Sequence, residues 1–78
     1  MITKSHQPFD SDHPLAGVEG PRVKFDAQRM VDGKMCLVEI DGVLLSSGVR
    51  HDGNPSSLVL TWRDDEYHAL TILQPVSE

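Results

Sequence analysis

The polar side chains best suited to form a site gather in residues 48–57. This stretch contributes Arg50, His51, Asp52 and Asn54, followed by two serines. A histidine near a serine can act as the base beside a nucleophile, but catalysis also needs an orienting group, an oxyanion site and a cleft that excludes water. The Asp-Gly and Asn-Pro steps here are equally what a turn requires. We expect no enzyme, and treat the four named residues as candidate binding residues.

A second candidate surface combines aromatic and charged side chains. Trp62 and Arg63 precede two aspartates and a glutamate, and Tyr67 follows them. Aromatic residues flanked by charges are common at the energetic centres of protein interfaces. The same pair could equally close the end of a small core. The sequence therefore leaves both recognition and packing open for Trp62 and Tyr67.

No metal or cofactor site is expected. Residues 10–13 offer two carboxylates and an imidazole but lack the glycine turn and downstream glutamate of an EF-hand loop. Cys36 is the single cysteine, which excludes an internal disulfide and a thiolate-rich zinc site, so it is expected to be a small inert apolar residue. His68 is expected to be neutral within a strand and bonded to Thr61.

Composition restricts the partners of the chain. Twelve acidic residues against seven basic ones give a formal charge of −5, which opposes general attraction to a phosphate backbone. No segment approaches the ~20 apolar residues that cross a bilayer, and the first residues lack a signal peptide. We expect a cytoplasmic protein, typical in size and acidity of bacterial and phage proteins, that binds another protein or a second copy of itself.

The 78 residues suffice for one small domain. Prolines and glycines interrupt residues 1–21, where the apolar residues follow neither the period of 2 of a strand nor the period of 3.6 of a helix. This segment is expected to be an extended or disordered tail, which could lay Phe9, Leu15 and Val18 against a sheet face. Residues 22–78 are expected to form a single small β domain, because apolar residues recur at every second position between turn-forming dipeptides.

The Asp32-Gly33 step predicts a two-residue hairpin turn, because glycine takes positive φ freely and aspartate tolerates it. In this register Phe25 faces Ile40 and Ala27 faces Val38. A slip of one residue would turn polar side chains toward the core, so burial selects this register.

One cost of this register is a like-charge pair, Asp26 opposite Glu39, unless Lys24 or Arg22 lies close enough to compensate. A competing interpretation makes Asp26 the N-cap of a short helix over residues 27–31. Five residues form at best a marginal helix.

The Asp41-Gly42 step predicts a second two-residue turn. It would place Ile40 opposite Val43 and Val38 opposite Leu45. The apolar face shared by these strands would then hold Val23, Phe25, Ala27, Val31, Cys36, Val38, Ile40, Val43, Leu45 and Val49.

A further hairpin is expected between residues 57–62 and 67–73, joined by the charged residues 63–66 and ended by Pro75. Trp62 would face Tyr67. Both faces of this hairpin are apolar, so both need cover, from barrel closure, the N-terminal tail or a second copy.

The sequence thus predicts a mainly β protein, an antiparallel meander of about five strands. It could close as a small SH3-like or Sm-like barrel, or remain an open sheet that dimerises. The favoured function is that of a non-enzymatic protein–protein interaction module. One alternative is a β-barrel that binds nucleic acid or a small ligand on one face, and another is an acidic phage-type inhibitor. A concave site lined by basic residues would favour the first alternative: Arg22, Lys24, Arg29 and Lys34.

Overall fold

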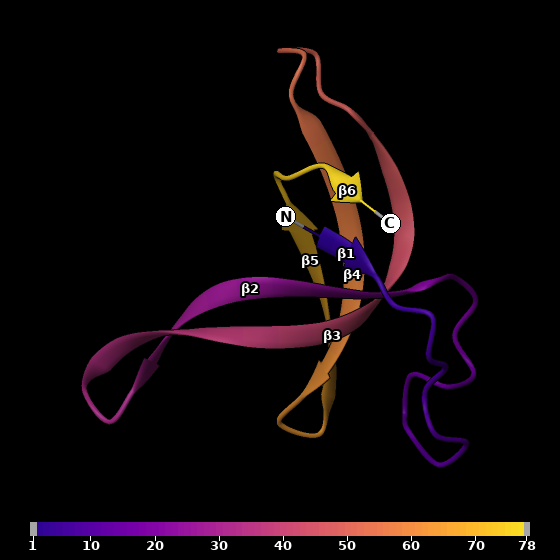
Figure 1. Ribbon diagram of the computed structural model, residues 1–78, viewed down its shortest axis with the longest axis vertical. Coiled ribbons are helices and arrows are strands. Elements are labelled where there is room, and N and C mark those ends of the chain that lie inside the picture. The colour runs from indigo at the N-terminus through magenta and orange to yellow at the C-terminus, as the bar shows by residue number, and fades with distance from the viewer. Residues whose placement is uncertain (1, 78) are drawn as a thin grey trace.

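The described chain, residues 2–77 of a computed structural model, folds as one open sheet of six strands without a helix (Figure 1). The strands are β1 (Ile2–Lys4), β2 (Arg22–Val31), β3 (Lys34–Val49), β4 (Pro55–Arg63), β5 (Glu66–Ile72) and β6 (Val76–Ser77). Their spatial order is β5-β4-β3-β2-β1-β6, antiparallel except for the parallel pair of β1 and β6. The predicted mainly β class is confirmed, but the sheet is mixed and not closed. The described residues hold no apolar helix of membrane-spanning length.

The β2–β3 hairpin has the predicted register. Asp32 and Gly33 adopt φ of 51° and 78°, as a two-residue turn with positive φ at both positions requires. Phe25 pairs with Ile40 and Ala27 with Val38. Strand β2 runs through residues 27–31, so the alternative short helix is wrong.

The predicted like-charge pair is also present, because Asp26 lies opposite Glu39. Lys24 compensates for it, with its Nζ 3.7 Å from Oε1 of Glu39. The sheet therefore tolerates this pair through a neighbouring cation on the same face.

The β4–β5 hairpin pairs Trp62 with Tyr67, as predicted. Its turn is shorter than expected, since Arg63 and Glu66 pair within the ladder. Only two residues make the bend, Asp64 and Asp65, with φ of 54° and 59°. Aspartate can take this left-handed conformation, although at a higher cost than glycine.

The predicted turn at Asp41-Gly42 is wrong, because β3 runs through both residues without a break. Val38 therefore does not face Leu45, and Ile40 does not face Val43. A Cβ on Gly42 would lie 2.5 Å from Cγ1 of Val59 and 2.8 Å from a β4 carbonyl oxygen. This glycine permits close approach of a neighbouring strand. A glycine within a strand often marks such a position.

Gly42 marks the corner of the sheet. It pairs with Val23 of β2 on one side and with Thr61 of β4 on the other. The register between β3 and β4 then shifts between Leu44 and Ser46, which is a bulge that bends the strand. As a result, the β2–β3 hairpin crosses the β4–β5 hairpin (Figure 1).

The hydrophobic core lies on one face of the bent sheet. Its buried members are Ile2, Val23, Phe25 and Val59. Partly buried side chains complete it: Ala27, Ile40, Leu44, Leu70, Ile72 and Val76. We call this face the core face and the opposite one the leader face.

The leader face is named for residues 5–21, which we call the leader. Leu15 of the leader is 1% exposed and lines hollows that it shares with Val43 and Trp62. Strand β1, which precedes the leader, pairs with β2 and buries Ile2 in the core. The leader thus lies beside Trp62 on one face of β4, while Val59 on the other face is buried in the core.

Part of the predicted buried face is instead exposed. Val31, Cys36, Leu45 and Val49 are all exposed to solvent. The first two lie in a stretch of the β2–β3 hairpin that has no third strand beside it. Leu45 lies at the bulge, and Val49 ends its strand. Assigning these residues to the core was wrong because it assumed that β3 turns back at Asp41.

Candidate interaction surface

The residues predicted to form a site lie at opposite ends of β4. Arg50, His51, Asp52 and Asn54 precede this strand, whereas Trp62 and Arg63 end it and Tyr67 follows. A nine-residue strand spans about 30 Å at ~3.3 Å per residue. The two predicted groups therefore cannot act on one small ligand.

The connection between β3 and β4 is a tight loop of residues 50–54, shorter than expected because the strands extend further. Nη2 of Arg50 lies 3.0 Å from Oδ2 of Asp52, and Oδ1 of the same carboxylate accepts from the backbone N–H of Asn54 at 3.1 Å. The backbone N–H of Arg50 donates to the Asn54 carbonyl at 2.8 Å. These polar groups fix the loop conformation, while His51 is exposed.

The aromatic pair holds the leader in place. The rings of Trp62 and Tyr67 meet edge to face, with centroids 4.7 Å apart. The hydroxyl of Tyr67 donates to the carbonyl oxygen of Pro14 at 2.8 Å. Packing is thus one role of this pair.

His68 is half-buried, and its ring has a different hydrogen-bond partner from the one expected. Its Nε2 lies 3.2 Å from the backbone oxygen of Arg63 and 3.9 Å from Oε2 of Glu66. The hydroxyl of Thr61 donates instead to the backbone carbonyl of His68 at 3.2 Å. Thr61 was therefore the wrong partner for the ring, because its hydroxyl is already bonded to the adjacent strand.

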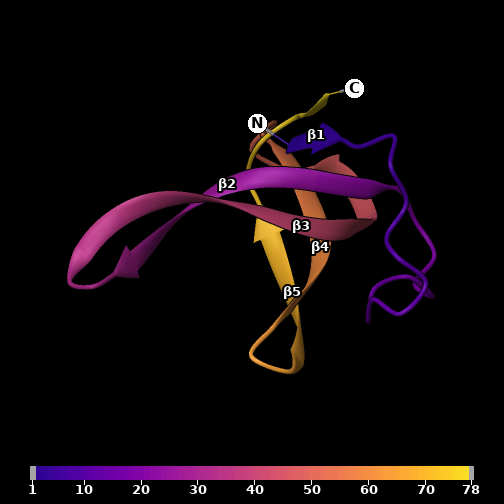
Figure 2. The same cartoon turned by 60° about the horizontal axis from the view of Figure 1, so that its bottom comes forward.

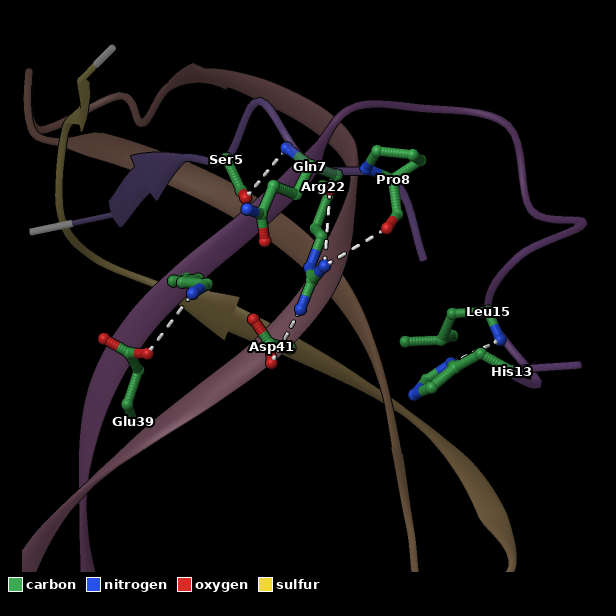
Figure 3. A network of polar contacts seen from close by, with 9 residues as sticks. Ser5, Gln7, Pro8, His13, Leu15, Arg22, Glu39 and Asp41 are labelled. Atoms are coloured by element: carbon green, nitrogen blue, oxygen red, sulfur yellow. Dashed lines mark hydrogen bonds and ion pairs between the residues drawn. The ribbon is translucent and has the colours of Figure 1, made fainter. Parts of the chain in front are cut away.

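Arg22 forms a polar centre that the sequence does not reveal (Figure 3). Its Nη2 lies 3.2 Å from Oδ2 of Asp41, and its Nη1 donates to the carbonyl oxygens of Gln7 and Pro8 at 3.3 and 3.4 Å. The guanidinium also lies over the ring of Phe9, 4.4 Å from its centroid. A single cation thus joins β2, β3 and the leader.

The ring of Phe9 also stacks on His13, with centroids 4.6 Å apart. Nδ1 of His13 in turn accepts from the backbone N–H of Leu15 at 3.1 Å. A hollow of about 280 Å³ lies between the leader and the sheet at this point. These contacts anchor Leu15. The charge of Arg22 is already shared among oxygens of Asp41, Gln7 and Pro8. Only the return of the leader to β2 creates these contacts, so no local signal could have indicated them.

The far end of the β2–β3 hairpin is the most exposed apolar part of the described chain. Ten consecutive residues, 28–37, are all exposed, and we call them the arm. Figure 2 shows the arm projecting away from the other strands. On its leader-face side, Met30, Met35 and Leu37 are 61%, 58% and 70% exposed. Met30 lies directly opposite Met35, so the three side chains form one patch.

Among residues 2–77, no third strand pairs with the arm on either side. Strand β1 pairs with β2 only at Val23 and Lys24, and β4 pairs with β3 only from Gly42 onward. The radius of gyration of 13.1 Å exceeds the ~11.5 Å of a compact chain of this length. The register of this patch could be predicted, but its exposure could not, because it depends on where the neighbouring strands end.

Among the described residues, no three His, Cys, Asp or Glu side chains are grouped to hold a metal ion. Comparison with protein-family models, with curated proteins and with solved structures finds no match. The arrangement of the molecule itself is therefore the basis for inferring its function.

Proposed function

We propose that this chain is a non-enzymatic protein–protein interaction module whose contact surface is the arm. The observation that carries the proposal is the exposed patch of Met30, Met35 and Leu37 on a hairpin without a third strand. An isolated two-stranded hairpin is at best marginally stable in water. A bound partner would supply the missing strand, and its side chains would lie beside the exposed apolar ones.

The chemistry of the arm suits protein recognition. Methionine is enriched at interfaces, and its flexible, polarisable side chain adapts to irregular surfaces. A free strand edge accepts an extended segment through backbone hydrogen bonds, while neighbouring side chains supply specificity. The arm offers both features within ten residues.

The surfaces predicted from sequence have a smaller part in this proposal. The ion pair of Arg50 with Asp52 and the hydrogen bond of Tyr67 to Pro14 serve the protein's own conformation. A base–nucleophile pair also lacks support, because His51 is exposed while Ser57 is buried among core-face side chains.

The alternative of a nucleic-acid or small-ligand site has no specific observation behind it. Arg22 and Lys24 lie on the leader face and pair with Asp41 and Glu39. Arg29 and Lys34 extend from the other face of the hairpin, so the four basic residues do not line one concave surface. For an acidic inhibitor, the carboxylates would need to share one side, and those of Asp32, Asp52 and Asp64 lie in three separate turns.

We infer a cytoplasmic setting from Cys36, which is unpaired and exposed on the arm, since reducing compartments preserve free thiols.

The proposal is tested by capture from a lysate of the native host on three immobilised proteins. These are the wild type, an arm variant with Met30→Ser and Leu37→Ser, and a control with Val49→Ser and Leu73→Ser. The control removes two apolar side chains that are also exposed but lie outside the arm. We expect the wild type and the control to retain the same proteins and the arm variant to lose them.

Equal capture by all three proteins, each with a native circular dichroism spectrum, would contradict the proposal. So would a wild-type protein that retains neither its own chain nor any other protein.

A further inference from the structure

We propose that the arm pairs with the arm of a second copy of this chain, along the free edge of β3, to form a four-stranded antiparallel sheet centred on Cys36. This inference rests on the proposed function and names the partner of the same surface. It would make the protein a two-fold symmetric dimer, in which each arm supplies the third strand that the other lacks.

The free edge has backbone groups placed for such pairing. In a two-residue hairpin, the residues that flank the turn exchange hydrogen bonds with each other. Lys34 and Cys36 therefore direct their backbone groups toward β2, whereas Met35 and Leu37 direct theirs outward. The outward edge is free up to Asp41, because β4 joins only at Gly42.

The edge of β3 suits pairing better than the edge of β2. Residues 35–38 of β3 are uncharged and apolar, whereas β2 carries Asp26 and Arg29 within its free part. Charges inside an edge strand are the usual device against edge-to-edge pairing. Strand β3 lacks this protection between Lys34 and Glu39.

Symmetry restricts the register, and the axis at Cys36 is the one that opposes the uncharged residues of the arm. A two-fold axis perpendicular to the sheet keeps each residue on the same face in both copies, so opposed residues must have numbers of equal parity. With the axis at Cys36, Met35 lies opposite Leu37 of the second copy and Lys34 lies opposite Val38. No like charges meet, and the patches of Met30, Met35 and Leu37 from both arms join into one apolar stripe.

The monomer exposes more surface than a compact chain of its mass. The accessible surface is 5550 Å², whereas a compact monomer of this mass exposes about 4,700 Å². This excess reflects the extended shape of the chain, in which the arm projects from the other strands and offers its free edge to a partner (Figure 2).

The charge distribution also favours contact through the arms. Arg29 and Lys34 against Asp32 give the arm a formal charge of +1, so the rest of the chain carries −6. Pairing through the arms holds the acidic remainder of each chain at opposite ends of the shared sheet. Contact through any other surface would bring these negatively charged parts of the two chains together, where they repel each other.

The first test is the mass of the full chain in solution, by size-exclusion chromatography with light scattering over a wide concentration range. We expect twice the mass of the chain for the wild type. Leu37→Pro removes an outward N–H but none that bonds to β2, so we expect a monomer with an unchanged circular dichroism spectrum. Leu37→Val keeps the N–H and an apolar strand former, and should remain a dimer.

The second test reports the register in the wild-type protein. Opposed Cys36 residues would form a non-hydrogen-bonded pair with Cα atoms ~4.5 Å apart, within the range that a disulfide accepts. Diamide, the oxidant, takes two electrons and two protons from the two thiols as one S–S bond forms. Within a dimer this cross-link forms at a rate independent of protein concentration.

A monomeric wild type, a Leu37→Pro variant that stays dimeric, or a dimer without this cross-link each overturns the pairing. A monomer whose arm variant still loses captured proteins would overturn the second-copy partner alone and leave the proposed function standing.

Discussion

Gly42 of β3 lies against Val59 of β4 so closely that a Cβ on the glycine would come within 2.5 Å of Cγ1 of the valine. This contact sits at the corner of the sheet, where β3 leaves β2 and joins β4. The corner sets the direction in which the arm leaves the core. It therefore links the packing of a single glycine to the surface that we propose for binding.

Replacing this glycine tests the corner. Gly42→Ala forces Val59 or the β4 backbone to move, and overpacking of this kind costs about 1–3 kcal/mol. Gly48→Ala is the matched control, because a Cβ there meets nothing within 4 Å. Urea unfolding should show the loss for the first variant and a change below ~0.5 kcal/mol for the second. Equal stabilities would show that the corner is not tightly packed.

The leader should behave as part of the core. Leu15→Ala removes a side chain that is 1% exposed, and we expect a loss of about 2–4 kcal/mol in the free energy of unfolding. Leu73→Ala deletes the same atoms at an exposed position and should change stability little. If Leu15→Ala were as stable as the control, the leader would not be packed on the sheet.

Arg22 should hold the leader through its charge and its planar shape. Arg22→Ala removes contacts to Asp41, two carbonyl oxygens and Phe9, with an expected cost of about 2 kcal/mol. Lys24→Ala, which breaks a more exposed ion pair, should cost less than ~1 kcal/mol.

Hydrogen exchange gives a local measure of the same anchor. The backbone N–H of Ser5 donates to Arg22, and that of Leu44 donates to Pro21. Both should exchange faster in Arg22→Ala and remain protected in Lys24→Ala. Unchanged protection in Arg22→Ala would mean that the other leader contacts suffice.

The β4–β5 turn should be open to improvement. Asp64 and Asp65 both have positive φ, and Asn-Gly is the dipeptide that this turn favours most. We expect Asp64→Asn with Asp65→Gly to stabilise the protein by about 0.5–1 kcal/mol, since glycine relieves the left-handed strain. Asp64→Asn with Asp65→Asn removes the same charges and should gain less in thermal unfolding. A larger gain for this control would assign the effect to charge.

The sequence indicated the local pairings because a strand hairpin is specified by residues close together in the chain. Asp32-Gly33 supplies the positive φ of the first turn, and the alternation of apolar residues selects its register. The opposition of Trp62 and Tyr67 follows in the same way. These predictions needed only the turn residues and the recurrence of apolar residues at every second position.

Only the tertiary structure decided what depends on segments far apart in the chain. Gly42 reads locally as a turn residue, and contact with Val59 makes it a corner within a continuous strand. The leader contacts of Arg22 require residues 5–21 to fold back across the sheet.

The patch of Met30, Met35 and Leu37 is exposed because β1 and β4 end short of it. Burial is set by which strands become neighbours and where they stop. Pairing of strands far apart in the sequence requires long loops to close at an entropic cost, so contacts along the whole chain decide which strands pair.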